Sequence, residues 1–112
     1  MANKSGAIAA GFPLVVNTRR DLYSPAAGNR FIGHLRVVNQ SGVLQTFRYA
    51  IAPDATPPSD TVADANWYVV DLPLDGVPFS EGIVVGDGQH LWIRASSLLV
   101  AFHLNGRENL DT

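Results

Sequence analysis

The chain has 112 residues, which is the size of one domain with a single hydrophobic core. Charged residues make up 16% of it, against roughly 25% in an average globular protein, so we expect other protein chains to cover part of the surface. The absence of cysteine excludes a disulfide-linked scaffold, a thiol nucleophile and a cysteine zinc site. The net charge of -2 argues against a dedicated nucleic-acid-binding protein, whose basic face would raise the isoelectric point above about 9.

The charges are unevenly distributed along the sequence. Residues 1–50 carry six basic residues and one acidic residue, whereas residues 51–112 carry two basic and nine acidic residues. In a fold that takes strands from both halves, these charges either mix over one surface or form opposed faces that guide copies of the chain together. Seven of the eight basic residues are arginine, whose planar guanidinium group suits ion pairs at protein interfaces.

Residues 1–12 are predicted to form an N-terminal arm that precedes a single domain over residues 13–112. The first eleven residues are mainly alanine, glycine and serine, so they gain little by packing on their own domain. We expect the arm to be flexible alone and to become ordered against a neighbouring chain, with Ile8 and Phe12 as its apolar anchors. The apolar stretch from residue 6 to residue 16 is too short to span a membrane, and two arginines follow it where a signal peptide has its cleavage site.

Strands are the main elements that the rest of the sequence predicts. Short ones are expected at residues 14–16 and 22–23. Between Arg30 and Gln40, apolar and polar residues alternate with the period of a half-buried antiparallel strand. Turn-forming residues and a second alternating segment at 43–51 follow, so these two segments are predicted to form a hairpin.

The second half of the sequence continues the same pattern. Residues 52–66 contain three prolines and are predicted to form a surface loop, with at most one helical turn after Ser59. Further strands are expected at residues 67–72, 83–85, 91–94 and 100–104, the last two as a second hairpin. Seven or eight short strands without an amphipathic helix are typical of an all-β fold, an antiparallel β-sandwich or jelly roll.

Several segments of the sequence resemble a family of small structural proteins of tailed-phage particles. The similarity spans residues 20–108 and is carried by turn and core residues at 22–28 (LYSPAAG), 37–42 (VVNQSG), 46–53 (TFRYAIAP), 68–74 (YVVDLPL), 88–97 (GQHLWIRASS) and 100–108 (VAFHLNGRE). The last segment includes a terminal glycine-x-glutamate. The resemblance implies a β-sandwich structural subunit without catalytic residues. Residues 75–85 are shorter than the family's usual connection, and the arm lies outside the similarity.

No catalytic or metal site is predicted. The three histidines, His34, His90 and His103, all fall on the polar side of predicted strands, and two of them could meet across a sheet, but no carboxylate spacing supports a metal site. The three aspartates of residues 54–64 share one loop, but their spacing matches no known calcium loop. The sequence also lacks the Gly-x-Ser-x-Gly turn of a serine nucleophile.

Trp67, Trp92 and Arg94 are the candidate interface residues in the body of the domain. Because neighbours in a strand alternate, one of Trp67 and Tyr68 faces away from the core, and Trp92 and Arg94 share the side opposite Leu91. An outward-facing tryptophan either contacts another subunit, stacks on a sugar or is buried under a loop. We expect contact with another subunit.

These observations predict a virion structural protein, in the first place a capsid decoration (cement) subunit that binds and stabilises the shell. The alternatives are a tail, neck or baseplate accessory protein, or a carbohydrate-binding β-sandwich that stacks sugars on its tryptophans. The expected partners are the chain itself, as a homotrimer by analogy with decoration proteins of phage shells, and a phage capsid or tail protein, in a virion assembled in the host bacterial cytoplasm. We expect no cofactor, no nucleic-acid partner and no membrane partner.

Overall fold

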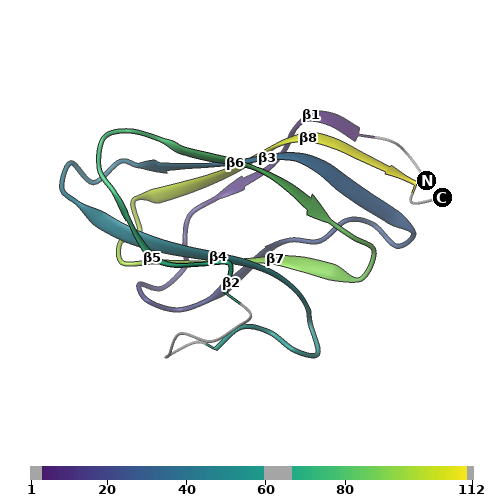
Figure 1. The fold of residues 1–112 in the computed structure, drawn as a ribbon, viewed down its shortest axis with the longest axis horizontal. Coiled ribbons are helices and arrows are strands. Elements are labelled where there is room, and N and C mark those ends of the chain that lie inside the picture. The colour runs from purple at the N-terminus through teal and green to yellow at the C-terminus, as the bar shows by residue number, and fades with distance from the viewer. Residues whose placement is uncertain (1–3, 60–66, 111–112) are drawn as a thin grey trace.

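The protein is a two-layer, all-β domain (Figure 1). The computed structural model describes residues 4–59 and 67–110. Its strands are β1 (Lys4–Gly11), β2 (Arg20–Tyr23), β3 (Asn29–Asn39), β4 (Gln45–Pro53), β5 (Val69–Leu74), β6 (Phe79–Val85), β7 (Gln89–Ala95) and β8 (Val100–Leu110). They form two antiparallel sheets, in the orders β1-β8-β3-β6 and β2-β7-β4-β5, which confirms the predicted β-sandwich. The described residues contain no helix that is long and apolar enough to cross a membrane.

The strand pairing follows the order of a jelly roll. Strand β1 pairs with β8, β2 with β7, β3 with β6 and β4 with β5, as in a long hairpin rolled so that successive pairs fall in opposite sheets. Strand β8 also pairs with β3, and β7 with β4, which completes each sheet. Every connection except the one between β4 and β5 therefore passes from one sheet to the other.

Both predicted hairpins are wrong for this reason. The turn after β3 leads into β4, and the turn after β7 leads into β8, but in each case the two strands belong to different sheets. Strand β3 instead pairs with β8 along its whole length, from Asn29 opposite Leu110 to Asn39 opposite Val100. Turn-forming residues allow a reversal of the chain, but the choice between pairing and crossing depends on which partner buries the apolar side of each strand.

The expected N-terminal arm is instead a strand of its own domain. Residues 4–11 pair with β8, from Lys4 opposite Glu108 to Gly11 opposite Phe102. Their small side chains offer little to pack, but the backbone hydrogen bonds of an edge strand do not require large side chains.

Two further local predictions concern the loops. Residues 14–16 do not form the expected strand, because Pro13 has no backbone donor and Asn17, with a φ of 53°, turns the chain toward β2. The helical turn expected after Ser59 lies outside the described residues.

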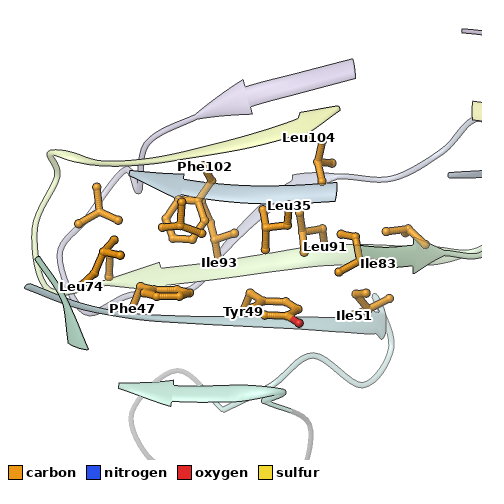
Figure 2. Packing of buried hydrophobic residues seen from close by; sticks show 14 of the residues in the cluster. Leu35, Phe47, Tyr49, Ile51, Leu74, Ile83, Leu91, Ile93, Phe102 and Leu104 are labelled. Carbon is orange, nitrogen blue, oxygen red and sulfur yellow. The ribbon is translucent and has the colours of Figure 1, made fainter. Parts of the chain in front are cut away.

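The main hydrophobic core lies between the two sheets (Figure 2). In β3 the inward residues Phe31, Leu35 and Val37 are fully buried, as their alternation predicts. Phe47 of one sheet and Phe102 of the other meet edge to face, with ring centroids 6.1 Å apart. Such contacts bury apolar surface from both sheets at once, so neither layer is stable without the other.

A buried carboxylate connects the sheets near the β2–β3 turn. Glu108 is 1% exposed and accepts hydrogen bonds from the Tyr23 hydroxyl, the Ala26 amide and the Asn29 side chain. Burial and the nearby carboxylate raise the pKa of Tyr23, so its hydroxyl stays protonated and can donate. The glycine-x-glutamate segment that the sequence singled out therefore has a structural role.

Candidate interaction surfaces

Trp92 lies on the outer face of the β2-β7-β4-β5 sheet, as its alternation predicts, but it is only 7% exposed. It packs with Trp67, Ala50 and Ala52 in a second, smaller core outside this sheet. The two alanines provide the space into which the large rings fit. Neither tryptophan offers an exposed ring to a second subunit or to a sugar, which corrects the expectation of outward aromatics that another chain must cover.

Two segments that are distant in sequence cover these tryptophans. The Arg19 side chain donates a hydrogen bond to the Pro58 carbonyl at 2.7 Å, and its guanidinium carbon lies 5.8 Å from the centre of the Trp92 ring. The Trp67 indole nitrogen donates to the Ser59 carbonyl at 2.9 Å. The loop after β4 and the segment before β2 thus close over the sheet, which strand alternation alone cannot reveal.

Arg94, also expected at an interface, belongs to an ion-pair cluster within the domain. Arg48 lies directly opposite Arg94 on β4, and its guanidinium binds both carboxylate oxygens of Asp71, at 2.8 and 2.9 Å. Arg94 is 3.6 Å from the same carboxylate. Asp71 has a φ of 48° in a bulge of β5, which turns its side chain toward the two arginines. The hydrogen bonds from Arg48 hold the pKa of Asp71 below its ordinary value.

The two remaining candidate interface residues have different environments. Ile8 is partly buried and packs against the main core from β1. Phe12 follows β1 and stays 41% exposed, while its carbonyl accepts a hydrogen bond from Arg20. Phe12 is therefore the only one of the five candidates that presents a large apolar side chain to solvent.

A small cluster of ionisable groups lies at the edge of the β2-β7-β4-β5 sheet. His90 Nδ1 is 2.7 Å from Asp21 Oδ2, and the ligand atoms of His90, Asp21 and Asp54 all lie within 4.8 Å of one another. His34 and His103 are on the opposite sheet, so the structure does not bring the three histidines together. Of the predicted aspartate loop only Asp54 is described.

The end of the sandwich where four loops meet is apolar. The β3–β4 and β7–β8 loops touch through a hydrogen bond from the Gln40 amide to the Leu99 carbonyl, and the Asn39 side chain donates to the Leu74 carbonyl, where β5 ends. Among the described residues, eight of the thirteen exposed large apolar side chains are on these loops: Leu14, Val15, Val16, Val43, Leu44, Val77, Leu98 and Leu99. We call this surface the loop end.

The loop end is nearly uncharged as well as apolar. Residues 12–18, 40–44, 75–78 and 96–99 include one charged residue, Asp75. A shallow hollow of about 140 Å³ lies between the β3–β4 and β5–β6 loops, beside Val43 and Leu44. Loops are usually polar, so the adjacent apolar pairs Val43-Leu44 and Leu98-Leu99 were a signal that the strand-based interpretation of the sequence passed over.

Comparison of the chain with protein-family models, with curated proteins and with solved structures found no match.

Proposed function

We propose that this chain is a structural subunit of a tailed-phage particle, a decoration (cement) protein of the capsid shell, and that it binds the shell through the loop end. The observation that carries the proposal is the concentration of exposed apolar side chains on the four loops. Their exposed fractions run from 45% for Val16 and Leu98 to 72% for Leu14. Buried apolar surface is the main driving force of stable protein association.

The size of the loop end fits a protein interface. A fully exposed valine or leucine side chain presents roughly 60 to 120 Å² of apolar surface, from its burial free energy and about 25 cal/mol/Å². Eight such side chains, each about half exposed, present on the order of 300 to 500 Å². A standard interface buries about 800 Å² per partner and is a little over half apolar, so the loop end supplies the apolar part of one such contact.

Two further observations support this proposal over its alternatives. The jelly roll hosts many unrelated functions, so the fold alone does not separate a particle subunit from a lectin. The two tryptophans that a carbohydrate-binding site was expected to use, Trp67 and Trp92, are buried beneath the chain's own loops. The resemblance of residues 20–108 to structural proteins of tailed-phage particles favours the particle subunit.

The test compares variants of the loop end with a matched control. Leu44→Ser and Val77→Ser remove large exposed side chains from two of the loops, while Val70→Ser makes a similar change on β5, away from this end. We expect the first two to weaken binding to purified shells that lack this chain, with thermal unfolding unchanged, and the control to bind as the native protein does. Equal binding by all three variants would refute the role of the loop end.

Quantitative mass spectrometry of purified particles tests the position in the particle. A decoration protein occurs in a copy number comparable to that of the shell subunit. A few copies per particle would contradict the capsid position and favour the tail, neck or baseplate. Analytical ultracentrifugation of the free chain tests the homotrimer that is expected by analogy with decoration proteins. A chain that stays monomeric at micromolar concentrations would overturn that expectation.

A further inference from the structure

The outer face of the β1-β8-β3-β6 sheet is basic. Its outward positions on β3 and β8 carry five exposed basic side chains: Arg30, His34, Arg36, His103 and Arg107. The register places them side by side, with Arg36 opposite His103 and Ile32 opposite Arg107. The two acidic residues on the strands of this sheet within the described part, Glu81 and Glu108, fall on the inward phase. We call this surface the basic face.

Arg36 and Arg107 differ from Arg48 and Arg94 in how their charge is compensated. On the outer face of the β2-β7-β4-β5 sheet, Arg48 and Arg94 share the carboxylate of Asp71. On the basic face, neither Arg36 nor Arg107 makes a hydrogen bond or ion pair with any residue in 4–59 or 67–110. The domain as a whole has a net charge of -2, so this basic region is not a reflection of the overall charge.

The basic face also contains a trough and two exposed apolar side chains. A trough of about 370 Å³ runs beside β1, lined by Arg36, His103, Asn105 and the alanines of β1. The alanines leave this space because their side chains are short. Ile32 and Val84 are cross-strand partners on the same face and are 47% and 51% exposed. Arginine is enriched at protein interfaces, and Ile32 and Val84 add apolar surface that a partner can bury.

We propose that the basic face binds an acidic protein surface, with Arg36 and Arg107 each pairing with a carboxylate and Ile32 and Val84 supplying apolar contact. Arg36 lies opposite His103, so about four residues along the strands, or ~13 Å, separate it from Arg107. Carboxylates on residues i and i+4 of an extended segment have the same separation. Arginine binds carboxylates in a bidentate geometry.

Nucleic acid is the less favoured partner for this face. Among its described outward positions on β3, β6 and β8 the face holds no phenylalanine, tyrosine or tryptophan, so it lacks the large aromatic rings on which bases stack best. Its exposed aliphatic residues suit a protein surface better than a phosphate backbone. The inference does not depend on the proposed particle function, because it concerns the basic face, whereas the proposed contact with the shell is made by the loop end.

The experiment measures binding of the full chain to a fluorescein-labelled oligoglutamate peptide by fluorescence anisotropy at low and high salt. Arg36→Gln, Arg107→Gln and the double variant are compared with Arg20→Gln, which removes the same charge from the other sheet. Oligoglutamine and a charge-matched single-stranded DNA serve as comparison probes. Circular dichroism and thermal unfolding verify that each variant is folded, which is expected because the substituted side chains on the basic face are exposed.

We expect the native chain to bind oligoglutamate, to lose affinity as salt rises and to ignore oligoglutamine. The double variant should bind about tenfold more weakly, equivalent to ~1.4 kcal/mol and within the range of two exposed ion pairs. Arg20→Gln should change the affinity by less than about twofold. No binding of oligoglutamate, an equal loss in Arg20→Gln, or tighter binding of the DNA than of the peptide would each overturn the proposal.

Discussion

Substituting Gly106 tests the close approach of β3 and β8 at the paired glycines Gly33 and Gly106. Gly106 on β8 lies opposite Gly33 on β3, in the longest ladder of the fold. A Cβ atom at position 106 would lie 2.4 Å from the Ile32 carbonyl oxygen and 2.6 Å from the Gly33 Cα. Both atoms belong to the backbone, so no side-chain rotation can relieve the clash. Gly106→Ala is therefore expected to push β3 and β8 apart.

The magnitude follows from the distances. Ordinary contact begins at 3.4 Å, so the strands must separate locally by about 1 Å, which breaks hydrogen bonds of about 2.9 Å. Two lost ladder bonds cost about 0.5 to 1.5 kcal/mol each and overpacking costs about 1 to 3 kcal/mol, for a total of about 2 to 6 kcal/mol. At about 4 to 8 °C per kcal/mol, the unfolding midpoint should fall by roughly 8 to 48 °C.

Gly82→Ala on β6 is the matched control. It lies in the same sheet, and its added Cβ would be 3.8 Å from the Gly33 carbonyl oxygen, an ordinary contact. The free energy of unfolding of Gly82→Ala should differ from that of the native chain by less than about 1 kcal/mol, because alanine loses less backbone entropy on folding than glycine does. Thermal and urea unfolding monitored by circular dichroism measure both variants. If Gly106→Ala is as stable as Gly82→Ala, the close approach of β3 and β8 is not present in the molecule.

Two further predictions concern the ion-pair cluster and β1. Asp71→Asn retains a residue that tolerates positive φ, and should lower the free energy of unfolding at neutral pH by about 1 kcal/mol, allowing for the carboxylate's solvent exposure. The pKa of Asp71 is lower in the folded chain than in the unfolded chain, so its ionised carboxylate stabilises the fold fully above the unfolded pKa of about 3.9. This contribution to the free energy of unfolding disappears as the pH falls through the folded pKa. The free energies of native and variant chains, measured by urea unfolding, should therefore converge in acid. Deleting residues 4–10 should lower the thermal midpoint by ~5 °C or more, because it removes an edge strand and the core contact of Ile8; an unchanged midpoint would restore the idea of a detached arm.

The sequence by itself determined which side of each long strand faces the core. The alternation of Phe31, Leu35 and Val37 with polar residues predicts the burial observed in β3, and it also places Arg36 outward. This information is local, because successive side chains of a strand always point to opposite faces. The all-β class follows from the same period and from the positions of turn residues, although β1 shows no alternation and residues 14–16 form no strand.

The candidate surfaces were only partly predictable. The alternation placed Trp92 on an outer face, but its cover comes from Arg19 and from the loop after β4, which are far away in sequence. Alternation predicted that Arg36 points outward, but Arg107 lies beyond the strand predicted at residues 100–104, so no side was predicted for it. Their arrangement on one face required the register of β3 against β8.

Tertiary structure alone decided which strands pair. The turn between β3 and β4 has the composition of a hairpin turn, yet the two strands lie in different sheets, and β3 pairs with β8 instead. The small residues of β1 show no alternation, and they form a strand because β8 offers an unpaired edge. Alternation specifies which face of a strand is apolar but carries no information about its neighbour, and the neighbour is selected by the joint burial of both sheets in one core.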